Sequence, residues 1–133
     1  MVGRSTWSLD GIVTLDEILA VCRSRAPTTA ELESYCGGVE LDTEGGLNAI
    51  ALEVARRYLA GDMDFGDADS VVNSLHGWSL THRDSMLPET ANGVFLAFDE
   101  GEYRHRGDSE SVDNEAKYTR PMIIDLLRGI DAV

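Results

Sequence analysis

Residues 43–78, TEGGLNAIALEVARRYLAGDMDFGDADSVVNSLHGW, decide the fold class because they contain two consecutive helical patterns. In the first half, apolar residues recur at the i, i+3, i+4, i+7 spacing of one helical face, and Gly61 ends the pattern. In the second half, Asp64 is placed to cap a helix whose apolar residues again share one face. The two stripes are Leu47, Ile50, Ala51, Val54 and Tyr58, and Ala68, Val71, Val72, Leu75 and Trp78. Because few residues separate the two helices, we expect them to be antiparallel.

Upstream, residues 14–42 predict a second hairpin made of two shorter helices. Thr14 with Glu17, and Thr28 with Glu31, each match the capping box that opens a helix. The glycines at 37–38 are expected to end the second of these helices. Residues 1–13 show too little pattern for an element, and we interpret them as a short extended arm that packs Trp7 on the domain.

Downstream, Pro88 and Glu89 predict the start of another helix, since proline is favoured in a first helical turn. Its apolar face consists of Ala91, Val94, Phe95 and Phe98. Gly93 lies within this helix and costs about 1 kcal/mol relative to alanine. That cost is acceptable if a neighbouring backbone packs closely against the glycine.

A last helix is expected after Asp113, which is a candidate N-cap. Its wide apolar face consists of Met122, Ile123, Leu126, Leu127 and Ile130. Pro121 has no backbone N–H to donate, so it predicts either a kink or a fresh helix start with Thr119 as the cap.

The whole chain therefore predicts an all-α fold. No segment alternates with a two-residue period over a length that would indicate a strand. We expect a helical bundle of about five to six helices with an N-terminal helical hairpin. By its length of 133 residues the chain is a single domain, which we divide into an arm at 1–13, a helical hairpin at 14–42 and a core bundle at 43–133.

Charge narrows the classes of partner. Eleven Lys and Arg residues against 24 Asp and Glu residues leave a net charge of -13, which repels phosphate backbones and anionic membranes. We expect no nucleic-acid and no membrane partner and favour a basic protein partner, although solubility explains the acidity equally well. Without a signal-peptide core or a run of membrane-spanning length, we expect a cytoplasmic protein. Cys22 and Cys36 are then expected to be free thiols.

No pattern of catalytic or metal-binding residues is present in the sequence. It has no P-loop, no dinucleotide fingerprint and no G-x-S-x-G. His76 and His82 are six residues apart rather than the three or four that place two ligands on one helical turn. His105, between two arginines, is expected to be a surface residue, and the acidic run at 62–69 fits a helix entry better than a calcium loop. We expect no enzyme activity, no metal and no cofactor.

The connection over residues 99–115 is the candidate binding surface, because seven carboxylates lie in it against two arginines. The predicted partner-binding residues are Asp99, Glu100, Glu102, Tyr103, Asp108, Glu110, Asp113 and Glu115. A tyrosine beside carboxylates offers buried area and charge complementarity to a basic partner. Phe98 and Tyr118 either contribute to that surface or belong to the core, in which case Tyr103 is the exposed ring.

Three segments, VARRYLAGDMDFGDADSVVNSL, LPETANGVFLAFDEGEYRH and EAKYTRPMIIDLL, follow one another along the chain. Their succession, over residues 47–128, resembles the small helical immunity proteins that neutralise colicin D-type ribonuclease toxins. The resemblance is one of pattern, in which two amphipathic helices, a Leu-Pro helix start and an apolar helix closing on an acid precede a final helix. It implies a stoichiometric inhibitor that occupies a basic, RNA-binding active site by presenting carboxylates in place of phosphates.

Two other function classes are compatible with the sequence. The first is a helical accessory or regulatory protein that binds its partner through an apolar groove, with the acids serving solubility. High salt should slow association for acid-steered recognition but not for a groove. The second is a carboxylate-based, metal-dependent enzyme, for which added metal ions should raise the thermal stability.

Overall fold

The computed structural model describes residues 11–131, and within that range the chain is helical and contains no strand. The elements are α1 (Leu15–Cys22), α2 (Thr29–Val39), α3 (Thr43–Ala60), α4 (Phe65–His82), α5 (Glu89–Glu100), a π-helix η2 (Glu115–Thr119) and α6 (Arg120–Asp131). The predicted all-α helical bundle is confirmed. Trp7 and most of the predicted arm lie outside the described residues.

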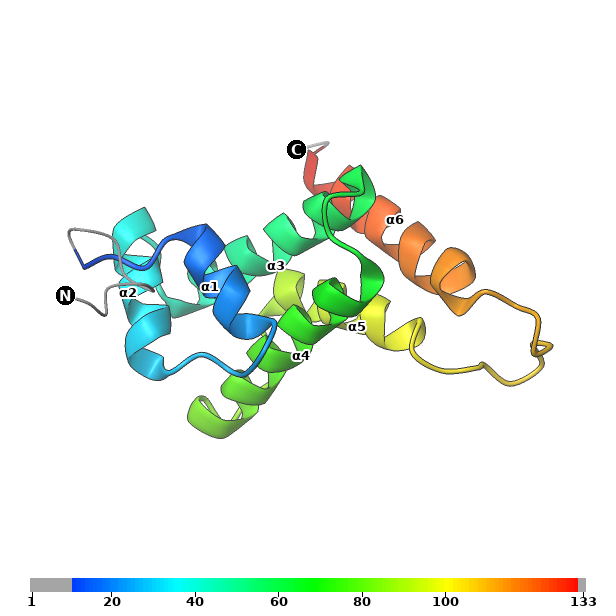
Figure 1. The fold of residues 1–133 in the computed structure, drawn as a ribbon, viewed down its shortest axis with the longest axis horizontal. Helices are drawn as coiled ribbons and strands as arrows, with labels where there is room; N and C mark the ends of the chain where they lie inside the picture. The colour runs from blue at the N-terminus through cyan, green and yellow to red at the C-terminus, as the bar shows by residue number, and fades with distance from the viewer. Residues whose placement is uncertain (1–10, 132–133) are drawn as a thin grey trace.

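The helices are arranged around α3, which packs against α2, α4, α5 and α6. Figure 1 shows α1 and α2 at one end of the molecule and the connection between α5 and α6 at the other. An ion pair between Glu44 and Arg83, 2.6 Å long, joins the start of α3 to the end of α4. The expected antiparallel pairing of these two helices is therefore confirmed.

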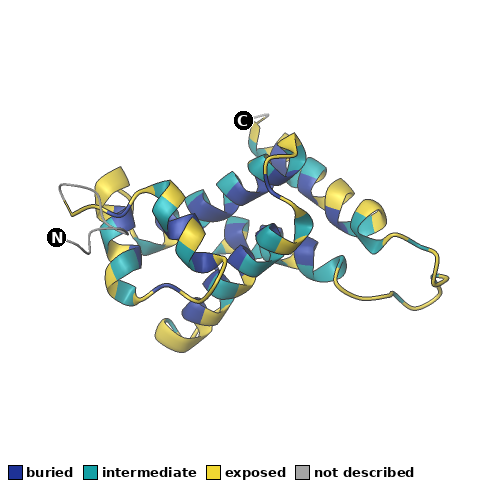
Figure 2. Cartoon of the chain, viewed as in Figure 1, coloured by how far each residue is buried: buried dark blue, intermediate teal, exposed yellow. Residues whose placement is uncertain are grey.

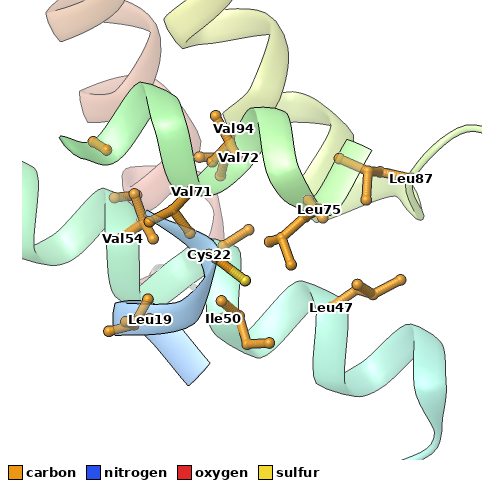
Figure 3. Packing of buried hydrophobic residues seen from close by; sticks show 14 of the residues in the cluster. Leu19, Cys22, Leu47, Ile50, Val54, Val71, Val72, Leu75, Leu87 and Val94 are labelled. Atoms are coloured by element: carbon orange, nitrogen blue, oxygen red, sulfur yellow. The ribbon is translucent and has the colours of Figure 1, made fainter. Parts of the chain in front are cut away.

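The core is built from the apolar stripes of α3 and α4. Every residue of the two predicted stripes is buried, with at most 4% of its surface exposed. In Figure 3, Ile50 and Val54 of α3 lie close to Val71 of α4 and to Cys22 of α1. Each such side chain contributes roughly 1.5–3 kcal/mol by leaving water, and Figure 2 shows the buried faces turned toward one another.

Both cysteines of this core are free thiols, as expected, and both are buried. Burial raises the pKa of Cys22 to about 12, so its thiol stays protonated at neutral pH. The Cys36 sulfur occupies the space where a side chain on Gly46 would lie. The two cysteines thus act as small apolar side chains.

The predicted helix starts are also confirmed. Thr14 and Thr28 each form a complete capping box, with Glu17 and Glu31 respectively. The Asp64 side chain accepts from the Asp67 backbone N–H at 2.8 Å. At the end of α3, Gly61 adopts a left-handed conformation with φ of 84°, which glycine takes without steric cost.

The expected end of α2 at the glycines 37–38 is wrong. The helix continues to Val39, and the left-handed residue that terminates it is Glu40, with φ of 59°. A Cβ on Gly38 would overlap the Ile12 side chain. The glycine at this position therefore allows a close approach of two segments rather than a helix stop.

The close neighbour of Gly93 is a side chain rather than a backbone segment. A Cβ at this position would lie 2.8 Å from the Leu126 Cδ1 atom of α6. Pro88 directly precedes α5 instead of occupying its first turn. Of the predicted apolar face, Ala91, Val94 and Phe98 are fully buried, and Phe95 is partly buried.

Of the two alternatives that Pro121 predicted, the fresh helix start with Thr119 as the cap is wrong. Five residues of π-helix run directly into α6 instead. The Thr119 side chain is buried and donates to the Ala97 carbonyl at 2.7 Å. A π-turn is a known irregularity of helices, and here it precedes a residue that has no N–H to donate. Met122, predicted to be core, is 37% exposed.

Ion pairs join helices on the outside of the bundle. Arg56 of α3 pairs with Asp131 of α6 at 3.0 Å, and Arg57 bridges Asp16 of α1 and Glu53, both at 2.8 Å.

No helix in residues 11–131 combines the length and the apolar character that a membrane crossing requires.

Candidate functional site

The segment over residues 101–114, which we call the acidic loop, joins α5 to η2 and projects from the end of the molecule (Figure 1). It leaves α5 at Gly101, where a Cβ would overlap the Thr119 hydroxyl and lie 3.0 Å from the Phe65 ring. Most of its residues are exposed, as Figure 2 shows. Five of the eight predicted binding residues lie in this loop, and the other three lie on the helices beside it.

A stack of three rings organises the acidic loop. His105 lies between Tyr103 and Tyr118, with ring centroids 4.5 and 3.7 Å apart and interplanar angles of 23° in both pairs. Its Nε2 atom is 2.7 Å from the Glu100 carbonyl oxygen and 3.2 Å from a Glu100 carboxylate oxygen. The His105 side chain is 16% exposed, so the ring is partly buried within the stack rather than fully exposed at the surface.

Asp108 points into the loop. Its Oδ2 atom accepts from the Tyr118 hydroxyl and its Oδ1 atom from the Lys117 ammonium group, both at 2.5 Å. These two donors, Lys117 first, lower the pKa of Asp108. Only 9% of this side chain is exposed, so Asp108 holds the loop against η2.

The two ends of the loop are fastened by further hydrogen bonds. The Asn114 side-chain amide donates to the Tyr103 carbonyl at 2.6 Å. The Asp113 carboxylate accepts from the Ala116 backbone N–H at 3.2 Å, the contact expected of the predicted cap. Across the tip, Arg104 and Glu110 form an ion pair of 3.3 Å between two exposed side chains.

Glu115 connects the loop region to the core. It accepts from the Tyr58 hydroxyl of α3 at 2.5 Å. Burial and this hydrogen bond raise the pKa of Tyr58. The Arg120 guanidinium lies over the same tyrosine ring, 5.1 Å from its centroid, a distance suited to a cation–π contact.

Sequence reasoning missed Asp69, which lies under the base of the loop. Burial, the hydrogen bond and charge of Glu102, and then the charge of Asp99 raise the pKa of Asp69 to about 8. Its Oδ1 atom is buried and has no hydrogen-bond partner among the described residues. The raised pKa means that the Asp69–Glu102 pair holds a proton at neutral pH. No spacing could reveal this, because the two acids are 33 positions apart in the sequence.

The predicted residues therefore divide by orientation. Glu102, Glu110 and Asp113 are exposed, and Tyr103 is 48% exposed. Asp99 and Glu100 are half-buried at the end of α5, while Asp108 and Glu115 accept hydrogen bonds from within the protein. Phe98 is fully buried and Tyr118 is half-buried, so Tyr103 is the exposed ring of this region.

The histidines of α4 serve packing. His76 stacks on Phe95 with ring centroids 4.0 Å apart, and His82 stacks on Trp78 at 5.3 Å. Within residues 11–131, no three His, Cys, Asp or Glu side chains gather in a way that could hold a metal ion.

The chain matches no protein-family model, and no curated protein or solved structure is significantly similar to it.

Proposed function

We propose that this protein is an acidic protein-binding module that recognises a basic protein through the acidic loop. The observation that carries the proposal is that the loop combines exposed carboxylates with a fixed internal framework. The ring stack centred on His105 and the inward-pointing Asp108 support the backbone, and Glu102, Glu110 and Asp113 are exposed on it.

A framework of this kind matters for affinity. Ordering a flexible loop on binding costs roughly 0.5–1.5 kcal/mol for each side chain that becomes fixed. A loop already held by hydrogen bonds at both ends avoids part of that cost. The favourable effect of its carboxylates on binding is then not offset by that cost. This effect consists of a faster encounter with a basic partner and of charge pairing in the complex.

We further propose that the partner is a basic nuclease toxin and that the protein is its stoichiometric, non-catalytic inhibitor. The support is the resemblance in residues 47–128 to immunity proteins of colicin D-type toxins, together with the net charge of -13. An active site that binds RNA must attract phosphates. Carboxylates displayed by the acidic loop carry the same sign of charge and compete for the same cationic side chains.

The test compares two triple variants by isothermal titration against a candidate basic ribonuclease toxin. The loop variant carries Glu102→Gln, Glu110→Gln and Asp113→Asn. The control carries Glu33→Gln, Asp62→Asn and Asp42→Asn, which are exposed acids distant from the loop in the sequence. Both variants change the net charge by three, and each replaces one helix-capping Asp by Asn, which also caps helices.

We expect the loop variant to bind at least tenfold more weakly than wild type and the control to bind within about twofold of wild type. Equal losses in both variants would assign the effect to overall charge and not to the loop. Unchanged affinity in the loop variant would remove the acidic loop from the interface.

A further inference from the structure

A second surface feature lies on the same helix pair as the acidic loop. A groove of about 500 Å³ runs between the first turns of α5 and the last turns of α6. Its walls and floor include Gly93, Leu126, Gly129 and Ile130, and Glu89 and Asp125 lie on its rim. The groove is therefore apolar inside and carries one acid from each helix.

Two glycines make the groove possible. A Cβ on Gly93 would press against the Leu126 side chain, whereas a Cβ on Gly129 would meet nothing within 4 Å. Each glycine costs an α-helix about 1 kcal/mol relative to alanine. At Gly129 the missing side chain brings no closer contact within the protein, and it leaves open space beside Ile130.

The apolar surface continues toward the acidic loop. Gly93 faces Leu126, and one turn later the Ala97 carbonyl accepts from Thr119, so α5 and the η2–α6 segment run antiparallel. On that register Leu96 and Met122 fall on neighbouring positions, and they are 42% and 37% exposed. Contiguous exposed apolar side chains of this size mark interaction surfaces more often than chance.

The rim charges favour a cationic occupant. Glu89 is exposed and makes no ion pair within residues 11–131. Asp125 is 3.9 Å from Arg128, with both side chains nearly four-fifths exposed, and such a pair is worth little. A second copy of this chain is a poor occupant, because a two-fold contact would bring these acids together and add two charges of -13.

We propose that the α5–α6 groove docks an amphipathic helix of a protein partner, with an aliphatic side chain in the floor and lysines or arginines paired with Glu89 and Asp125. Helix-in-groove recognition uses apolar anchors one turn apart, and the aliphatic stem of a lysine also covers apolar surface. This contact is separate from the acidic loop and goes beyond the function proposed for that loop.

The experiment uses a helical probe peptide and amide chemical shifts of the ¹⁵N-labelled protein. The probe is an alanine-rich peptide of about four turns with two leucines one turn apart and lysines flanking them. A matched peptide carries glutamate in place of each lysine. We expect the lysine peptide to shift the amides of Thr90, Gly93 and Gly129, and the glutamate peptide to leave them unchanged.

Two glycine substitutions locate the contact. Gly129→Leu fills the groove, and Gly77→Leu places the same side chain on the exposed face of α4, where a Cβ also meets nothing within 4 Å. We expect Gly129→Leu to weaken binding of the lysine peptide at least tenfold and Gly77→Leu to leave it within twofold. The double variant Glu89→Gln, Asp125→Asn adds no bulk and should also weaken binding.

Several results would overturn the proposal. The first two are chemical-shift changes confined to the acidic loop, and equally strong binding of the glutamate peptide. The third is the absence of any chemical-shift change at millimolar peptide. The fourth is broadening of the amide signals of the groove residues that grows with protein concentration in the absence of peptide, which would indicate self-association. The Glu102, Glu110 and Asp113 triple variant should bind the lysine peptide as wild type does. Loss of loop function and loss of groove binding are therefore distinguishable.

Discussion

The helical pair α3–α4 and the acidic loop are ordered by different forces. In the pair, ten stripe residues are almost wholly removed from water, and no single contact is decisive. In the loop, most side chains are exposed, and the shape depends on a ring stack and a few hydrogen bonds. The difference indicates that the pair determines the stability of the domain, whereas the loop is ordered but adds little to the free energy of unfolding.

The largest expected effect tests the apolar side of this comparison at a residue of α5 that packs on α3 and α4. Phe98 is fully buried and contacts the rings of Tyr58 and Phe65 at centroid distances of 5.0 and 5.7 Å. Phe98→Ala should lower the free energy of unfolding by about 3–5 kcal/mol, measured by urea denaturation. Leu96→Ala, on the exposed side of the same helix, should change it by less than about 0.5 kcal/mol. Similar losses for both would show that burial does not govern stability here.

A smaller effect is expected at the link between the two regions. Tyr58→Phe keeps the ring but removes the hydroxyl that donates to Glu115, and we expect a loss of about 1–2 kcal/mol because the bond involves a charged acceptor. Tyr35→Phe is the matched control, since the Tyr35 ring is buried and its hydroxyl makes no hydrogen bond within the described residues. Thermal unfolding of both variants measures the difference, and equal melting temperatures would contradict the role given to Glu115.

The next prediction concerns the pH dependence of stability. An unfolded Asp releases its proton near pH 3.9, whereas burial and Glu102 raise the pKa of Asp69 to about 8 in the folded state. Between about pH 4 and pH 8 the folded protein therefore holds the extra proton, and its stability falls as the pH rises through this range.

Asp69→Asn removes this titration. Its stability gain over wild type should be greater at pH 8.5 than at pH 5 by on the order of 1 kcal/mol, a modest figure because solvent screens a half-buried site. Asp62→Asn, at an exposed position, should show the same difference from wild type at both pH values. Denaturant titrations at the two pH values provide the measurement. A pH-independent gain for Asp69→Asn would show that the two carboxyls do not share a proton.

The smallest change in stability is expected where the loop alone is altered. His105→Ala removes the middle ring of the stack and should cost less than about 1 kcal/mol overall. Local order should respond far more, with amide hydrogen exchange over residues 101–114 at least tenfold faster. Arg106→Ala, at an exposed loop position, should leave the exchange rates unchanged. Unchanged rates in His105→Ala would mean that the stack does not hold the loop.

The two regions also differ in how far the sequence predicts them. Capping at Thr14, Thr28 and Asp64 and the stripes of α3 and α4 depend on residues three to seven positions apart, and the structure confirms all of them. The sequence pattern was misleading where a glycine makes room for a side chain that is distant in the sequence. Gly38 admits Ile12, and Gly93 admits Leu126, and neither partner is close in sequence.

The candidate site shows the same limit. The position of the acidic loop between α5 and the last helix followed from helix ends, so its location and charge could be predicted. The inward turn of Asp108 and Glu115 could not, because it depends on how η2, which carries Glu115 and Tyr118, packs beside the loop and Tyr58 of α3. Asp69 was missed for a similar reason, since only the fold brings it to Glu102.

The most direct test of the central claim is the hydrogen-exchange footprint of the complex with a basic ribonuclease toxin that the protein binds. We predict that binding slows amide exchange over residues 102–113 at least tenfold, while exchange in the α1–α2 hairpin is unchanged. Protection elsewhere on the surface, with the amides of the acidic loop exchanging as in the free protein, would contradict the claim.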